Sequence, residues 1–375
     1  MPATLQIGLI ASSRQTSGSD RYYFNLLRAL RQLGARNEGV VLGNPLDVEQ
    51  PLPGIHSFAP EGSPALRRWS GLRRAVRPLV AQSDVVVSHL AAHVFPVLDI
   101  IRERPLVEHF HGPWALEGRF AKLPPRTIAL RLLQEASVYR RAKRIVALSR
   151  SFAEVLQREY RISPGKIRIV PGGVDLDRFA PAVSRMQARE QLDLPRDRPI
   201  VVSVRRLESS KGIDRLARAV ELVRKEVPEV LFVIAGTGSL ASSLLQLVRE
   251  RGLEANVRFA GMIDDAQLAL LYRAADLSVV PSQAWEGFGL VCLESLASGT
   301  PVMVTPIGGL PEVVRDLEPS LIFEGTEVAH IGTGLRDALC GRIAVPNEDA
   351  CLRYAQGFGW STIAARVDAV YREVA

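Results

Sequence analysis

The sequence has few cysteines, few aromatic residues and no long apolar run. Its three cysteines (Cys292, Cys340 and Cys351) are an odd number without CxxC spacing, so we expect free thiols in a reducing compartment rather than a disulfide framework. No apolar run approaches the roughly 18–20 residues that a membrane-spanning helix needs. The first residues show no signal-peptide pattern. Together these absences favour a cytoplasmic globular protein.

Positive charge is concentrated in the first half of the chain. Residues 1–180 carry 26 Lys and Arg against 15 Asp and Glu, whereas the rest is net acidic and the whole chain has a net charge of +7. A basic half is typical of a protein that meets an anionic lipid surface, a phosphorylated acceptor or nucleic acid, although a solvated basic surface has the same composition. Aromatic residues make up only 6%, and no helix-turn-helix, zinc or RNA-binding signature is present, so we expect no nucleic-acid partner.

Short apolar runs alternate with helical lengths along the whole chain. Runs rich in Val and Ile, such as residues 84–90 and 144–149, are separated by amphipathic stretches, as in βα units that form a parallel sheet covered on both faces. A segment dense in Gly, Pro and Asp, at 171–182, precedes a second set of such runs. With 375 residues the chain is too long for one ordinary core. We therefore predict an α/β fold with two Rossmann-like, doubly wound domains at 1–180 and 181–357.

In such sheets, ligands bind beyond the carboxyl ends of the strands, so the residues there are the site candidates. The stretch "RRLESSKG" places Arg206 and Lys211 five residues apart in a loop from a strand to a helix. Cations are unfavourable at a helix N-terminus because the helix dipole attracts anions there. The pair therefore favours an anionic ligand such as a diphosphate, with two solvated surface cations as the alternative.

A second candidate lies in "PSQAWEGFGLVCLESLASG", at 281–299. The turn from Gly287 to Gly289 lets the backbone approach a ligand and leaves free N–H groups at the start of the next helix. Glu286 precedes this turn, and helical phase predicts that Glu294 faces the same side. A carboxylate among the apolar neighbours of Glu294 is costly unless it bonds to a partner. Two carboxylates beside amide donors suit a polyhydroxylated ligand, whereas a capped helix with a chance Glu is the alternative.

Four of the six histidines lie at predicted strand ends. They are His89, His93, His109 and His111. We predict that His109 and His111 point to opposite faces of their strand, one toward the site and one into the packing. A metal site needs several side chains that point toward one ion, and this spacing does not bring the histidines together in that way. We therefore expect no metal site.

These motifs together resemble the family 4 retaining glycosyltransferases, which have the GT-B fold of two Rossmann-like domains facing across a cleft. The resemblance covers the second half of the chain in order and spacing, and the first half more loosely. Its most specific part is the E-x7-E pair of Glu286 and Glu294, with Arg206 and Lys211 ahead of it. The matching strings are "KIRIVPGGVDLDRFAP", "RRLESSKGIDRL", "LFVIAGTGSL", "EGFGLVCLESLASGTPVMVTPIGGLPEVV" and "GWSTIAARVDAVYREV".

The resemblance implies a nucleotide sugar donor, with a UDP- or GDP-sugar expected, held by the C-terminal domain without a metal or other cofactor. Arg206 and Lys211 would neutralise the diphosphate, and Glu294 would hold the ribose hydroxyls. Glu286 would contact the hydroxyls of the transferred sugar, and His111 matches the family's histidine near that sugar. His111 and Glu286 are thus the implied catalytic residues. The other implied donor-binding residues are Gly18, Gly261, Met262, Gly287, Phe288, Gly289 and Leu290.

The implied reaction retains the anomeric configuration and transfers the sugar to a hydroxyl of a glycan, lipid-linked or small-molecule acceptor. In this fold the closing helix, 358–375, would pack back on the first domain. The chain departs from the family at Arg205, where a glycine is usual, and at "SGSD", where a double glycine is common.

Two basic stretches of the first half, at 65–80 and 126–144, carry Arg with aliphatic residues at roughly helical spacing, and the first of them also carries Trp69. That pattern is typical of a helix lying on an anionic membrane, so we expect a peripheral membrane enzyme with a lipid-linked or anionic acceptor. A sugar nucleotide epimerase and a non-catalytic sugar nucleotide binder are the alternatives to the transferase.

Overall fold

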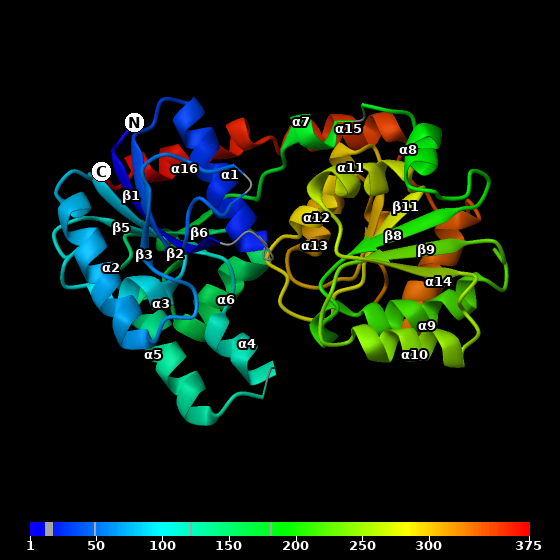
Figure 1. The fold of residues 1–375 in the computed structure, drawn as a ribbon, viewed down its shortest axis with the longest axis horizontal. Coiled ribbons are helices and arrows are strands. Elements are labelled where there is room, and N and C mark those ends of the chain that lie inside the picture. The colour runs from blue at the N-terminus through cyan, green and yellow to red at the C-terminus, as the bar shows by residue number, and fades with distance from the viewer. Residues whose placement is uncertain (12–17, 49, 121, 181) are drawn as a thin grey trace. The chain divides into compact units, whose positions relative to one another are not determined.

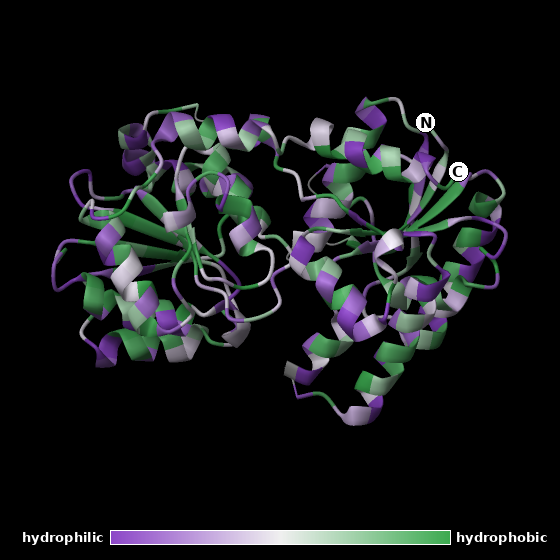
Figure 2. Cartoon of the chain, turned by 180° about the vertical axis from the view of Figure 1, so that it is seen from behind, coloured by the Kyte–Doolittle hydropathy of each residue, from purple (hydrophilic) through white to green (hydrophobic). Residues whose placement is uncertain are grey.

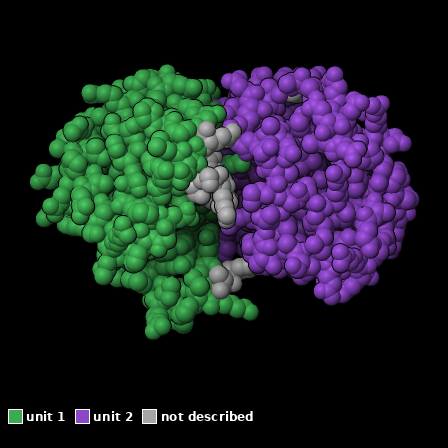
Figure 3. Space-filling view, viewed as in Figure 1, with its two compact units in different colours: residues 1–173, 360–375 green, residues 174–359 purple. Residues whose placement is uncertain are grey.

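The computed structural model describes residues 1–11, 18–48, 50–120, 122–180 and 182–375 (Figure 1). These residues form two compact units, which Figure 3 colours separately: unit 1 is Met1–Gly173 with Trp360–Ala375, and unit 2 is Val174–Gly359. The chain therefore changes units at 173/174 and at 359/360, a few residues from the predicted limits at 180 and 357. Both changes lie where Val174 forms an isolated bridge with Gly359.

Unit 1 contains a seven-stranded sheet with the order β3-β2-β1-β4-β5-β6-β7, in which all neighbours are parallel. Its strands are apolar runs because helices cover both faces of the sheet. The strands are β1 (Thr4–Ala11), β2 (Asn37–Gly43), β3 (Ile55–Ala59), β4 (Val85–Ser88), β5 (Leu106–Phe110), β6 (Arg144–Ala147) and β7 (Ile167–Ile169).

The helices of unit 1 come from both ends of the chain. The closing helix α16 packs against α1 and β6, whereas α2 and α5 both contact the short turn η1. The elements are α1 (Gly18–Gln32), α2 (Ala65–Val80), α3 (Ala91–Val94), η1 (Phe95–Val97), α4 (Trp114–Phe120), α5 (Pro125–Arg141), α6 (Arg150–Tyr160), η2 (Pro164–Lys166) and α16 (Trp360–Arg372).

Unit 2 contains a five-stranded parallel sheet with the order β10-β9-β8-β11-β12. Figure 2 shows hydrophobic strands inside each unit and hydrophilic residues on the outer sides of the helices. The prediction of two doubly wound sheets is confirmed. The strands are β8 (Ile200–Val204), β9 (Leu231–Ala235), β10 (Val257–Gly261), β11 (Leu277–Val280) and β12 (Val302–Val304).

Helices cover both faces of this second sheet. Helices α9, α10 and α14 pack together on one face, and α8, α11, α12 and α15 pack on the other (Figure 1). The elements are α7 (Leu176–Phe179), α8 (Arg185–Gln191), η3 (Ser209–Lys211), α9 (Ile213–Val223), α10 (Ala241–Glu250), α11 (Asp265–Ala274), α12 (Leu290–Ala297), α13 (Leu310–Val314), η4 (Pro319–Leu321), α14 (Val328–Leu339) and α15 (Glu348–Gln356).

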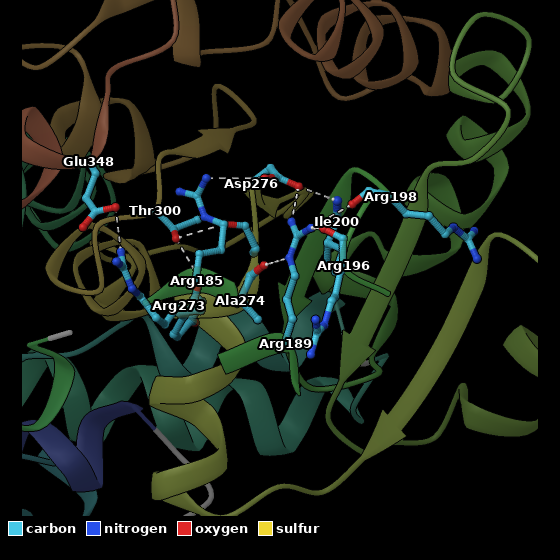
Figure 4. Close-up of polar contacts among 12 residues, drawn as sticks. Arg185, Arg189, Arg196, Arg198, Ile200, Arg273, Ala274, Asp276, Thr300 and Glu348 are labelled. Atoms are coloured by element: carbon cyan, nitrogen blue, oxygen red, sulfur yellow. Dashed lines mark hydrogen bonds and ion pairs between the residues drawn. The ribbon is translucent and has the colours of Figure 1, made fainter. Parts of the chain in front are cut away.

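A buried arginine of α8 ties together the segments that lead into β8 and β11 (Figure 4). Arg189 donates from Nε to the carbonyl of Ala274 (2.9 Å) and from Nη1 to the carbonyls of Arg196 (2.7 Å) and Arg198 (3.1 Å). Its Nη2 donates to Oδ2 of Asp276 (2.6 Å). One planar side chain thereby satisfies three backbone carbonyls and one carboxylate.

A pocket lies beside this arginine, at the amino ends of β8 and β11. Ligands of open α/β sheets bind at the opposite, carboxyl ends of the strands. Because Arg189 and Asp276, which line the pocket, are already bonded to protein groups, we assign this network to stability rather than to ligand binding.

Arg189→Met is expected to lower the free energy of unfolding by about 2–3 kcal/mol, measured by chemical denaturation. Removing one partner of a buried pair costs roughly 3–5 kcal/mol, but the Asp276 side chain is one-third exposed (33%), which reduces the cost. The control is Arg196→Met, which removes an exposed pair with Glu190 and should cost less than about 0.5 kcal/mol. Equal losses in the two variants would contradict the assignment.

Candidate functional site

Three loops at the carboxyl end of the unit 2 sheet meet around Glu286. Gly308, in the loop after β12, has φ 57°, and a Cβ there would lie 2.0 Å from the carbonyl oxygen of Glu286. Gly212, after β8, has φ 68°, and its Cβ would lie 2.0 Å from the carbonyl oxygen of Pro281. The N–H of Gly309 donates to the Glu286 carbonyl at 2.9 Å. Both contacts need glycine, so the loop that carries Glu286 is fixed from two sides.

The Glu286 carboxylate is buried between two cations. Its side chain is 8% exposed, and Oε1 accepts hydrogen bonds from Arg205 Nη2, Lys211 Nζ and Ser282 Oγ (3.1 Å). Burial alone would raise the pKa of this carboxyl, but the charges of Arg205 and Lys211 outweigh burial and lower the pKa to about 2. The carboxylate is therefore ionised at neutral pH. All three bonds are on Oε1, and among the residues that the structure describes none bonds to Oε2.

Arg205 is the member of this cluster that the sequence analysis did not select. It directly follows β8, its side chain is 7% exposed, and its Nη2 also donates to Ser282 Oγ at 2.8 Å. The sequence did distinguish position 205, because the family that the chain resembles usually has glycine there. An arginine that replaces glycine at the end of a buried strand brings a charge into the interior, and a buried charge needs a partner. Glu286 is that partner.

Arg206 and Lys211 complete a cluster of three cations. Lys211 is the last residue of η3, and burial together with the charges of Arg205 and Arg206 lowers its pKa, while the Glu286 charge opposes them. The Arg206 side chain is exposed and makes no hydrogen bond or ion pair to the described part of the chain. Glu208, whose carboxylate interacts with the Arg206 charge, and Glu286 together oppose the three cations with two negative charges. One positive charge remains, which an anionic ligand would neutralise.

The turn Gly287–Gly289 leads into α12, and Gly289 has φ 91°. No described side chain caps this helix, and the N–H of Cys292 donates to the Gly289 carbonyl at 2.9 Å. The N–H groups of Leu290 and Val291 have no partner in the described part of the chain and are open to an acceptor. Glu294 lies on α12 and is buried, as predicted. The helical-phase argument that related Glu294 to Glu286 was wrong, because α12 begins only at Leu290 and Glu286 lies in the preceding loop.

The remaining predicted residues lie in separate places. Gly261 ends β10 with φ 69° and open space beside its Cα, and Met262 next to it is exposed. Phe288 is buried against Phe358, so only its backbone could meet a ligand. Gly18 is the first residue of α1 in unit 1, and residues 12–17 before it lie outside the described part of the chain.

Unit 1 carries three stacked histidines at the carboxyl ends of β4 and β5: His109 lies within β5, and His89 and His111 follow β4 and β5. The ring centroids of His89 and His109 lie 4.5 Å apart, and those of His89 and His111 lie 5.5 Å apart. The prediction that His109 and His111 point to opposite faces was wrong, because side chains two residues apart share one face of a strand. Both rings also contact the ring of Tyr22.

All three histidines are neutral at pH 7. Burial lowers the pKa of His111 to about 4. Burial and, to a smaller extent, the neighbouring histidines hold the pKa values of His89 and His109 well below the usual range. In the described part of the chain, no group of three or more His, Cys, Asp or Glu has an arrangement that could hold a metal ion.

Family models match nearly all of the chain. Residues 184–356 match Glycosyl transferases group 1, and residues 16–178 match Glycosyltransferase Family 4. The D-inositol 3-phosphate glycosyltransferase of Corynebacterium aurimucosum is 30% identical over 391 aligned residues, which cover 96% of this chain and 92% of that protein. The protein of the same name from Streptomyces avermitilis is 37% identical over 323 residues, 82% of this chain and 67% of that protein. The match to that from Streptomyces scabiei, at 38% identity, spans 65% of this chain and only 56% of that protein.

Solved structures share the fold over the whole chain. Sucrose-phosphate synthase from Thermosynechococcus elongatus superposes with a TM-score of 0.83 at 23% identity, over 100% of this chain and 99% of that one. Anabaena Alr3699/HepE in complex with UDP and glucose superposes with a TM-score of 0.81 at 20% identity, over 99% and 100%. The two parallel sheets are thus those of the GT-B fold, and the chain belongs to glycosyltransferase family 4.

Proposed function

We propose that this glycosyltransferase uses a nucleotide diphosphate sugar, UDP- or GDP-linked, and retains the anomeric configuration on transfer. The observation that carries the proposal is the buried Glu286 between Arg205 and Lys211, with exposed Arg206 beside it. This arrangement offers positive charge for a diphosphate and an ionised carboxylate for sugar hydroxyls. The structures of Anabaena Alr3699/HepE, which contain UDP or UDP-glucose, support a donor of this class.

Each part of the donor has a proposed partner. Arg206 and Lys211 bind the diphosphate, and Glu294 accepts hydrogen bonds from the ribose hydroxyls. Glu286 accepts a hydroxyl of the transferred sugar at Oε2, since its Oε1 is already occupied. His111 of unit 1 contacts the same sugar. Backbone groups complete the site, at Gly18, Gly261, Met262, Gly287, Phe288, Gly289 and Leu290.

The reaction step needs a group that takes the proton of the acceptor hydroxyl. Glu286 is a poor base because its pKa is about 2, so it orients the sugar and stays ionised. We assign the proton to the departing diphosphate, which gains negative charge as the bond from the sugar to the phosphate breaks. Lys211 and Arg206 stabilise that charge, and the proposal requires neither a metal nor another cofactor.

One buried acid of unit 1, Glu135, does not support an epimerase. Glu135 has its pKa raised to about 7, first by burial, which is in the range of an acid/base catalyst. However, it is buried, and its oxygens accept hydrogen bonds from the hydroxyls of Tyr139 (3.3 Å) and Tyr160 (2.8 Å) and from the N–H of Ala115 (3.2 Å). These bonds fasten α4 and α6 to α5, so we assign Glu135 a structural role.

The acceptor is proposed to be a hydroxyl compound bound at a membrane or carrying phosphate. The relatives named D-inositol 3-phosphate glycosyltransferase suggest a small phosphorylated polyol. The surface of unit 1 suggests a lipid: on α2, Leu66 and Trp69 are 80% and 40% exposed beside the exposed Arg67 and Arg74. The described residues contain no helix that could cross a membrane.

Donor binding is tested by calorimetry with a panel of UDP-, GDP-, ADP- and TDP-sugars and the free diphosphates. One nucleotide series should bind the wild type, and Lys211→Met should weaken it by at least tenfold, because charge-assisted bonds to phosphate contribute roughly 1.5–3 kcal/mol. Glu294→Gln should also weaken it, by loss of the ribose bond. Arg215→Met, which removes an ion pair with Glu327, is the control. Unchanged affinity in Lys211→Met would rule out the proposed diphosphate site.

Substitutions at two glycines with the same φ distinguish the effect of the loop contact from the effect of backbone strain. Gly308→Ala and Gly252→Ala both place a side chain at φ 57°, but the added Cβ meets the Glu286 carbonyl in the first and open space in the second. Each should lose about 1 kcal/mol of stability from the left-handed conformation. Gly308→Ala should lose more than Gly252→Ala, because its Cβ, 2.0 Å from the Glu286 carbonyl oxygen, forces the loop to shift. Only Gly308→Ala should also abolish donor binding, as measured by calorimetry on folded protein. Full donor binding by Gly308→Ala would show that the loop contact is dispensable.

Membrane contact is tested by flotation with vesicles that contain anionic lipid, at low and high salt. The wild type should float at low salt and release at high salt, because the attraction is electrostatic in part. The double variant Leu66→Ser, Trp69→Ser should float less at unchanged net charge. A wild type that stays unbound at low salt would exclude the lipid surface.

A further inference from the structure

A chain of hydrogen bonds links a buried glutamine of β1 to His111. Gln6 is fully buried, and its Nε2 donates to Thr4 Oγ1 at 2.9 Å, which turns Oε1 toward His89. Gln6 Oε1 lies 3.0 Å from His89 Nε2. An amide oxygen only accepts hydrogen bonds, so His89 carries its proton on Nε2.

The proton on His89 Nε2 in turn determines which nitrogen of His111 is protonated. Burial keeps His89 neutral, so its Nδ1 has no proton and accepts. His89 Nδ1 lies 3.2 Å from His111 Nε2, which must therefore be the donor. His111 is neutral as well, so its Nδ1 holds a free lone pair. That nitrogen has no hydrogen-bond partner among the residues described, and is left for a ligand.

We propose that Gln6 and His89 are positioning residues that fix His111 in its Nε2–H tautomer, so that His111 Nδ1 accepts a hydrogen bond from a substrate hydroxyl. The second half of this statement rests on the proposed function. A bare nitrogen attracts a hydroxyl and repels the oxygens of a phosphate or carboxylate, which are acceptors too. His111 Nδ1 thus favours a substrate hydroxyl over an oxygen of a phosphate or a carboxylate.

A second chain runs beside the first and, among the described residues, meets it only at Gln6, whose side chain is also hydrogen-bonded to Tyr371. Tyr22 OH lies 3.2 Å from His109 Nδ1, and His109 Nε2 lies 2.8 Å from Tyr371 OH. His109 stacks on His89, and the Tyr22 ring meets His111 edge-on at 5.0 Å. Tyr22→Phe keeps this ring packing and removes only a bond to His109, so it is the matched control for substitutions in the first chain.

The tautomer is read directly from nitrogen NMR of the full chain labelled with ¹⁵N-histidine, without ligand, at pH 7.5. His111 Nε2 should resonate as a protonated nitrogen and Nδ1 as a bare one. His89→Leu removes the acceptor and should give a mixture of tautomers. His89→Asn can accept through Oδ1 at the place of Nδ1 and should restore the single tautomer. The control Tyr22→Phe leaves the hydrogen-bond chain intact and should keep the single tautomer of the wild type. A wild-type proton on Nδ1, or no change in folded His89→Leu, would overturn the proposal.

Calorimetry then tests what the tautomer does, with UDP-glucose, GDP-mannose, UDP and GDP as probes. For the sugar nucleotide that binds, His89→Leu should lose about twofold in affinity, because in an even mixture only half of the molecules carry the tautomer whose Nδ1 can accept. Its affinity for the matching free diphosphate should not change. An equal loss for both ligands would overturn the role in hydroxyl recognition. If no probe binds the wild type, the proposed function and that role fail together, while the NMR result on the tautomer stands by itself.

Discussion

The ionised carboxylate of Glu286 is the group on which the rest of the unit 2 site depends. A buried charge is tolerated only when it is paired and hydrogen-bonded, and here Arg205, Lys211 and Ser282 all bond to one oxygen. The pairing brings the loops after β8 and β11 together, and the loop after β12 approaches through Gly308. The surplus of positive charge that results is what suits the site to a diphosphate.

The two units supply opposite kinds of polar group. Unit 2 offers fixed charges, whereas unit 1 offers histidines that burial keeps neutral, with hydrogen bonds that run back to Gln6 in the sheet. Charged groups stabilise the negative charge of a leaving diphosphate. Neutral groups with a fixed proton distinguish hydroxyls from phosphate oxygens, because the pattern of donors and acceptors cannot adapt.

The sequence was sufficient to predict the two parallel sheets, since buried strands read as continuous runs of Val and Ile. It missed the edge strands β3 and β7, which are short and carry exposed positions. The sequence identified Arg205 only as a departure from the family pattern, because its partner Glu286 is 81 residues away along the chain. The convergence of His89 on His111 depends on the neighbouring registers of β4 and β5, and the relation of Glu286 to Glu294 depends on where α12 begins. Such long-range placements follow from packing and not from local pattern.

The most direct measurement is a crystal structure of the full chain with the nucleotide diphosphate that binds it most tightly. We expect the diphosphate to lie against Arg206 and Lys211, with Glu294 at the ribose and with Oε2 of Glu286 free toward the sugar position. The bonds from Arg205 and Ser282 to Oε1 should remain as they are in the unbound protein. A diphosphate bound away from these cations, for example in the pocket beside Arg189, would contradict the account.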